Sequence, residues 1–308
     1  GDLDDKDFSI QESLYTNGIT VQASTYHDKL DPNEMTGTFL IKTYFLKKNI
    51  KKAIELVETL LLDPYLDNEE EIYATLNSID ADFSSDLQEN SYELACCKGA
   101  GRFSRTYALS DMWVGLAFKK RLEELKDSDE VIQIISSVYN ELFRKGKFTC
   151  SIVSDEQGIN ETLVLLKPLL AELNKTTDYN GIKDYSFLDS VCASYGNDKV
   201  FYEFETMTNT TVSICKTVPF MSDLSVPLFI LSKLLETEFL YPEIREKLGA
   251  YGVSCVQNSY SGNMYISTYR DTNCSSCLKV FPDTIQKATN GEFDDDSVER
   301  AIIQYFSY

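Results

Sequence analysis

Residues 239–273 constrain the fold more than any other stretch of the chain. They read FLYPEIREKLGAYGVSCVQNSYSGNMYISTYRDTN. A short charged helix, a Gly-Ala-Tyr-Gly turn and two runs of alternating strand character follow one another. This order predicts a helix followed by an antiparallel strand pair, which is typical of the α+β class.

Two donors flank the turn in this stretch. Arg245 and Tyr251 lie six residues apart, on either side of the helix stop at Gly249. The spacing predicts that the guanidinium and the phenol leave the helix end and the turn in roughly the same direction. Both groups suit a carbonyl or an oxyanion. The alternative is a helix C-cap followed by an edge strand, with Arg245 solvated and Tyr251 half-buried, because one Arg/Tyr pair is a weak signal.

The rest of the chain mixes helical and strand patterns in both halves, with hairpin-like strand pairs instead of strict βαβ alternation. We therefore predict an α+β fold in which helices pack on one face of a mainly antiparallel sheet. A polar segment around Asn180-Gly181 has no clear period and predicts a linker. The predicted domains are residues 1–174 and 185–308, joined by a linker at residues 175–184.

The predicted strands cover residues 19–25, 39–45, 147–154, 199–206, 211–217, 253–258 and 263–269. Among the helices, we expect one continuous helix from about residue 110 to residue 125. A second, at 228–240, should end near Tyr241-Pro242 and restart as a short helix carrying Arg245. The acidic runs that start at Glu69 and Asp294 begin predicted helices, where carboxylates suit the helix dipole.

The charge balance excludes several classes of partner. Lys and Arg total 29 against 49 Asp and Glu in 308 residues, a formal net charge of -20. Such a surface repels nucleic acid and anionic membranes. Apolar residues make up 43% of the chain, which is enough for a real core. No apolar run approaches the ~18 residues of a membrane span, and no targeting segment is visible, so the compartment stays open.

His27 is the one histidine in the chain. A Ser-His-Asp or Cys-His pair would need it, and no nucleophile signature lies nearby. Zinc motifs with two histidines, such as HxxEH, cannot be built from these residues. We expect His27 to be a partly exposed loop residue after a strand. Cys274 and Cys277 form a single CxxC, half of what a structural zinc site needs. We therefore predict no metal site and no complete catalytic site in this segment.

Taken together, these segments resemble the insulinase/pitrilysin class of zinc metallopeptidases, in particular its presequence protease and falcilysin branch. The stretch LLETEFLYPEIREKLGAYG followed by STYRDTN carries most of the likeness. Upstream, YTNGITV and ENSYELACCKGAGRFS are similar to further family segments in the same order. The agreement covers essentially the whole chain. One departure is Leu248, where the family commonly has the first glycine of a pair.

The resemblance implies a clamshell of two halves, each with two related α+β domains of the mitochondrial processing peptidase and insulinase type. The N-terminal half carries zinc in an HxxEH site, and the C-terminal half closes the peptide chamber. By position, Arg245 and Tyr251 would be the substrate-binding and transition-state donors of that second half. Unstructured peptides are the implied substrates, and the N-terminal half of the same polypeptide is the implied partner.

We further expect the chain to begin after the opening strands of a third domain and to stop before a fourth domain is complete. It would then be inactive alone, with zinc in the full-length protein, and its exposed sheet edges could support self-association. One alternative is a non-catalytic structural or binding subunit of the same fold. Another is an unrelated acidic binding module, which would make the motif series accidental.

Overall fold

The computed structural model describes residues 5–66, 68–175, 184–196 and 199–307. Its contacts divide the chain into two compact units, and each consists of three separate stretches of sequence. Unit 1 comprises residues 1–24, 38–80 and 122–183, and unit 2 comprises residues 25–37, 81–121 and 184–308. Both units are described below, each by itself.

Unit 1 is built mainly from helices around one apolar cluster. Its helices are α1 (Asp5–Tyr15), the short 3-10 helix η1 (Lys47–Asn49), α2 (Ile50–Leu62), α7 (Val131–Lys145) and α8 (Glu156–Leu173). Ile50 and Ile54 of α2 pack with Leu166 and Leu169 of α8. Because these side chains recur at helical spacing, each helix presents one apolar face to the cluster.

A two-stranded hairpin is shared between the units. It is formed by β1 (Ile19–His27) and β2 (Met35–Thr43). Residues 19–24 and 38–43 belong to unit 1, whereas the tip, residues 25–37, belongs to unit 2. The helices α3 (Glu69–Ser85) and α6 (Leu116–Lys126) are likewise divided between the units.

Unit 2 is organised around an antiparallel sheet in the order β3-β5-β4. Its strands are β3 (Val212–Lys216), β4 (Gly252–Asn258) and β5 (Asn263–Tyr269). Gly252 pairs with Tyr269 at one end of the β4–β5 register and Asn258 with Asn263 at the other. The hairpin predicted from alternation at residues 253–269 is therefore confirmed.

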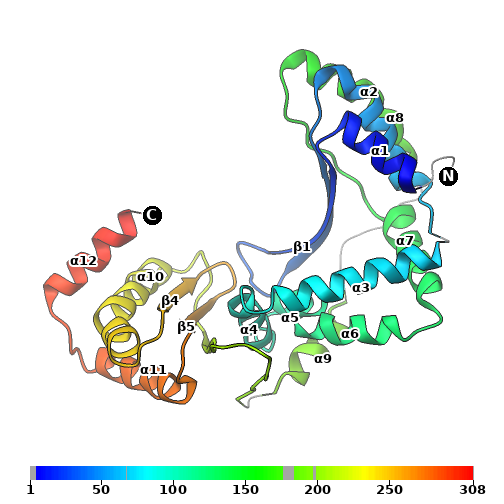
Figure 1. The fold of residues 1–308 in the computed structure, drawn as a ribbon. Helices are drawn as coiled ribbons and strands as arrows, with labels where there is room; N and C mark the ends of the chain where they lie inside the picture. The colour runs from blue at the N-terminus through cyan, green and yellow to red at the C-terminus, as the bar shows by residue number, and fades with distance from the viewer. Residues whose placement is uncertain (1–4, 67, 176–183, 197–198, 308) are drawn as a thin grey trace. The chain divides into compact units, whose positions relative to one another are not determined.

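Helices cover both faces of this sheet. On one face, Cys255, Met264 and Ile266 pack against α10 (Ser225–Leu234), the π-helix η2 (Leu235–Lys247) and α11 (Cys274–Thr289). On the other, Tyr265 packs against α4 (Ser91–Ala100), which lies beside the sheet in Figure 1. The final helix, α12 (Asp295–Phe306), contacts α10. Thus α10, η2 and α11 pack on one face as expected, whereas α4, from earlier in the chain, covers the other face.

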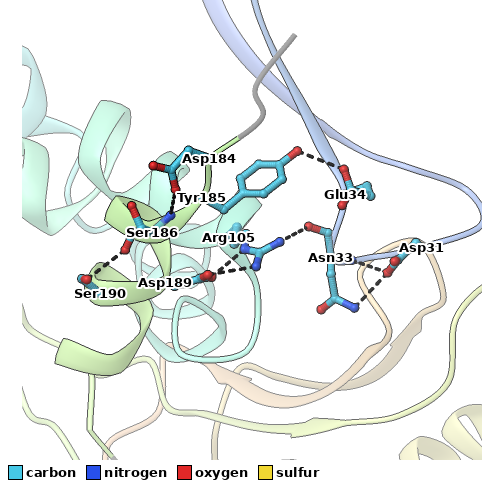
Figure 2. A network of polar contacts seen from close by, with 9 residues as sticks. All are labelled: Asp31, Asn33, Glu34, Arg105, Asp184, Tyr185, Ser186, Asp189 and Ser190. Atoms are coloured by element: carbon cyan, nitrogen blue, oxygen red, sulfur yellow. Dashed lines mark hydrogen bonds and ion pairs between the residues drawn. The ribbon is translucent and has the colours of Figure 1, made fainter.

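The tip of the shared hairpin is fixed within unit 2 by Arg105, at the start of α5 (Arg105–Val114). Its guanidinium forms two hydrogen bonds with Asp189 of α9 (Ser186–Ser194), at 2.6 and 3.0 Å, and a third at 2.9 Å with the Asn33 carbonyl. The Tyr185 ring lies against the guanidinium, with its centroid 4.3 Å from the Arg105 Cζ, and its hydroxyl donates to Glu34 (Figure 2). The turn is therefore held by a planar fork of charge-assisted bonds.

Two of the predicted strands are wrong. Residues 147–154 form no strand, and the backbone N–H and carbonyl of Phe148 bond instead to the Asn174 side chain. Residues 199–206 also form no strand; there Tyr202 and Phe204 stack on each other, with ring planes at 12°. Alternation of apolar and polar residues indicates only a segment that suits a half-buried strand. Whether the segment forms a strand also depends on a neighbouring strand to pair with, which the local pattern cannot show.

Two helix boundaries also differ from expectation. The helix predicted at residues 110–125 is split at Gly115 into α5 and α6. The helix predicted to stop at Tyr241-Pro242 continues through Pro242, wound as the π-helix η2. Proline lacks the N–H of an α-helical bond and crowds the carbonyl four residues earlier. The wider winding is consistent with both constraints.

The predicted linker falls largely on residues 176–183, which lie outside the described residues, so the domain boundary stays a prediction. Sequence analysis did not identify α1 or α9. Within the described ranges, no helix combines the length and apolar character that a bilayer crossing requires.

Candidate functional site

The C-terminal end of η2 positions Arg245. Gly249 adopts a φ of 77°, which favours glycine, and so reverses the chain after the helix. The Ala250 N–H donates to the Ile244 carbonyl at 3.2 Å, which satisfies a carbonyl at the helix end. Ile244 and Ala250 are both buried. The turn is thus anchored on its inner side while Arg245, between them, stays exposed.

Arg245 and Tyr251 lie in direct contact, in the arrangement predicted from their spacing. The Arg245 Nη1 donates to the Tyr251 carbonyl, and its Cζ lies 5.5 Å from the Tyr251 ring centroid. The same Cζ lies 5.6 Å from the Tyr241 ring. Tyr251 is 64% exposed rather than half-buried. One guanidinium is therefore held between two tyrosines, a geometry in which cation–π attraction and a backbone bond act together.

The contacts continue beyond the predicted pair. The Tyr251 ring meets the Tyr269 ring edge-on, with centroids 6.1 Å apart and planes at 74°. The Cζ of Arg270 lies 5.1 Å from the Tyr269 ring. We call these five side chains, Tyr241, Arg245, Tyr251, Tyr269 and Arg270, the Arg–Tyr row. Sequence reasoning missed three of its members, although Tyr269 and Arg270 lie in the STYRDTN segment that carried the resemblance.

A buried carboxylate supports the end of the row. Asp271 is fully buried and accepts hydrogen bonds from Thr211, at 3.1 Å, and from Thr268. Its other oxygen accepts the Asn273 N–H at 3.1 Å. The backbones of Asn209 and Asp271 form an isolated antiparallel bridge. Three donors on one buried carboxylate satisfy it well, so the segment after Tyr269 is rigidly placed.

Glu243, which lies close to Arg245 on η2, is occupied by two lysines. Glu243 pairs with Lys247 at 2.8 Å and with Lys287 at 3.8 Å, and the hydrogen bond from Lys247 lowers the pKa of Glu243. Among the described residues, Arg245 itself has no carboxylate within 4 Å. Apart from the single bond to the Tyr251 carbonyl, its donors are available to a ligand.

The cysteines and the histidine do not supply a second site. Burial raises the pKa of the Cys277 thiol to about 11, so it is neutral and a poor nucleophile. His27 is not a loop residue as expected, but the last residue of β1, half-buried against Tyr107 at 5.7 Å between ring centroids. Over the part of the chain that the structure describes, no three His, Cys, Asp or Glu side chains are grouped so as to hold a metal ion.

Comparisons with known proteins match nearly the whole chain. Residues 132–305 match the family model described as "Peptidase M16 inactive domain", and residues 1–125 match the model of the region associated with subfamily C of the same peptidase family. The mitochondrial presequence protease of Schizosaccharomyces pombe is 23% identical, over 97% of this chain and 30% of that protein. That of Aspergillus fumigatus is 26% identical, over 95% of this chain and 28% of that protein. The chain thus spans about a third of the length of these relatives.

A solved structure supports the fold. The crystal structure of a conserved protein from Enterococcus faecalis V583 superposes with a TM-score of 0.63. The likeness covers 97% of this chain and 70% of that one, at 12% sequence identity. At this identity the likeness establishes the fold alone, and it agrees with the predicted α+β class.

Proposed function

Because this chain belongs to the peptidase M16 family, we propose that it is a C-terminal-half segment of a zinc metallo-oligopeptidase. In this role it closes the peptide chamber and donates hydrogen bonds to the substrate. The observation that carries the proposal is the contact between Arg245 and Tyr251. Their donors lie together on the exposed side of a turn that the buried Ile244 and Ala250 anchor, where they can meet the carbonyl of an extended peptide.

The chemistry proposed for the pair is electrostatic. When a peptide bond is attacked, negative charge develops on the carbonyl oxygen, and a preorganised donor lowers the energy of that state. Tyr251 offers its phenol, since no described residue accepts from or donates to its hydroxyl. Arg245 offers the N–H groups not used by the Tyr251 carbonyl. Peptidases of this kind gain from bringing donors in only on closure, because water is excluded at the same time.

Zinc is expected in the full-length protein, in the other half. The side chains of this chain do not fit it: one histidine is present and no described cluster of three ligands exists. The N-terminal catalytic half of the same polypeptide is therefore the proposed partner, and unstructured peptides are the proposed substrates. In the β3-β5-β4 sheet, β3 is an edge strand and pairs with another strand on one side. We propose its other side as the surface for any self-association.

The test replaces the donors in the natural polypeptide that carries this chain. Tyr251→Phe removes the phenolic hydroxyl and keeps the ring, so kcat/KM should fall about 100- to 1000-fold, as for other single oxyanion donors. Arg245→Lys, which loses the planar fork, should also lose activity. Tyr260→Phe is the matched control, because Tyr260 is 50% exposed and stacks on Phe220 away from the row. Unchanged kcat/KM in Tyr251→Phe would overturn the assignment.

The alternative function is a non-catalytic structural or binding subunit of the same fold. The family description of residues 132–305 as an inactive domain and the single histidine of the chain favour it as the second candidate. The reading frame upstream of this segment discriminates between the two. An HxxEH motif followed by a downstream glutamate supports the enzyme, whereas its absence from the natural polypeptide supports the structural subunit.

A further inference from the structure

The Arg–Tyr row ends in a second exposed arginine that the proposed function does not use. We propose that Arg270 binds a carboxylate of the peptide whose carbonyl is held by Arg245 and Tyr251, and so selects among peptide substrates. This inference rests on the proposed function, because it needs a peptide lying along the row. Tyr251 and Tyr269 connect the two arginines by successive ring contacts.

The backbone at Arg270 is unusual. Its φ is 51°, and no other non-glycine residue among those described has a positive φ. The left-handed conformation is unfavourable for an L-residue other than glycine, because the Cβ comes too close to the following carbonyl oxygen. The buried Asp271 network, with Thr211, Thr268 and Asn273, holds the next residue and so maintains this conformation. Such outliers cluster at functional sites; here the outlier sets the side chain over Tyr269.

The guanidinium of Arg270 has donors to spare. Its Nη2 is 3.1 Å from Glu89 Oε1, and the two side chains are 41% and 69% exposed. An ion pair this exposed contributes little, because water solvates both partners well. A substrate carboxylate can therefore replace Glu89, or bind the unused edge of the guanidinium beside it. The planar fork suits a carboxylate in two-point contact, and stacking on Tyr269 fixes the orientation of the plane.

The surroundings favour a carboxylate on a peptide over other anions. The chain carries a net charge of -20, so polyanions such as nucleic acid are repelled at long range. An extended peptide rises about 3.3 Å per residue, so a carboxylate a few residues from the bound carbonyl can reach Arg270. Two sources are compatible with this chemistry, an Asp or Glu side chain and the C-terminal carboxylate of the peptide.

The experiment measures peptide affinity by fluorescence anisotropy in the natural polypeptide. One peptide series exchanges Glu for Gln at each successive position, and a second exchanges a C-terminal acid for an amide. The wild type should prefer one carboxylate peptide over its neutral partner by at least about fivefold. Arg270→Gln should abolish that preference, and Arg270→Lys should retain part of it. The series that discriminates identifies which carboxylate is bound.

Arg300→Gln is the matched control, because Arg300 forms a comparable exposed pair with Glu238 at 2.9 Å; it should keep the wild-type preference. If peptides bind but no carboxylate is preferred, or if Arg270→Gln keeps the preference, this inference is overturned while the proposed function stands. If no peptide binds at all, both are overturned. If Tyr251→Phe keeps full kcat/KM while the Arg270 preference is observed, the donor assignment alone fails.

Discussion

Some polar groups of Arg245 and Tyr251 stabilise the turn, and the others are left for the proposed ligand. The backbone carbonyl of Tyr251 holds the Arg245 guanidinium, whereas the phenol of the same residue has no hydrogen-bond partner among the described residues. One contact therefore fixes the pair without consuming the group proposed to act on the substrate. Replacing Tyr251 by Phe leaves this backbone bond in place, so the variant separates the chemistry of the hydroxyl from the geometry of the turn.

The environment of His27 predicts how the stability of the folded protein depends on pH. Burial lowers the pKa of the imidazole from 6.5, and the nearby Pro32 carbonyl opposes this shift. Its Nδ1 is buried without a hydrogen-bond partner in the described part of the chain. The folded protein therefore favours the neutral ring, whereas the unfolded chain takes up a proton near pH 6.5. Stability is present above that pH and is lost as the pH falls towards the folded-state pKa.

We predict that His27→Phe removes this pH dependence. One proton contributes a slope of at most about 1.4 kcal/mol per pH unit. Because the chain has one histidine, the wild-type unfolding midpoint should fall between about pH 7.5 and 5.5 more steeply than that of the variant. Thermal unfolding followed by circular dichroism measures both profiles. Tyr26→Phe, at an exposed neighbour, should behave as the wild type. Parallel profiles for wild type and His27→Phe would contradict the prediction.

At the scale of the elements, alternation predicted the β4–β5 hairpin. The six-residue spacing across Gly249 predicted that the Arg245 and Tyr251 side chains extend in roughly the same direction. Both depend on local rules, namely alternation and a glycine turn. The failed strand at residues 147–154 and the missed partners Tyr269 and Arg270 depend on contacts with remote segments. A period of two cannot show that Asn174 binds the backbone of Phe148, nor that β5 brings Tyr269 against Tyr251.

The split between α5 and α6 has a specific cause that the helical pattern concealed. Asp111 is fully buried, and its Oδ1 accepts the N–H groups of Leu116 and Ala117 at 2.9 and 3.3 Å, at the start of α6. Its Oδ2 accepts the Tyr195 hydroxyl at 2.7 Å and pairs with Lys98 at 3.3 Å. A side chain from α5 thus caps α6, and the backbone must turn closely around it.

Gly115 allows the backbone to pass this close to Asp111. A Cβ at this position would lie 2.3 Å from Asp111 Oδ1 and 2.6 Å from its Cα. We predict that Gly115→Ala lowers the stability of unit 2 by about 1–3 kcal/mol, as overpacking of a filled site does, and chemical denaturation measures the change. At Gly252 a Cβ would meet its neighbour at an ordinary 3.6 Å, so Gly252→Ala is the control. Equal stability of the two variants would rule out the close approach as a constraint.

At the scale of the whole molecule, the proposed function assigns this chain the substrate-facing part of a site whose metal is expected in the other half. The row is built within unit 2, where the β3-β5-β4 sheet and its helices hold η2 and β5 together. Along β4, Glu236 accepts the Cys255 N–H at 2.9 Å, and Arg245 binds the carbonyl of Tyr251, the residue just before the strand. Side chains thus occupy backbone groups of this edge strand, which protects it from pairing.

We predict that the 308-residue chain, purified alone, neither cleaves peptides nor binds stoichiometric zinc. A zinc peptidase site needs about three protein ligands, and one histidine with no described ligand cluster does not provide them. Fluorogenic peptide cleavage with and without a chelator, together with metal analysis, measures both properties. Adding the N-terminal half of the natural polypeptide should restore cleavage, and Tyr251→Phe in the added chain should reduce it. Chelator-sensitive cleavage by the purified chain alone would refute the division of the site between two halves.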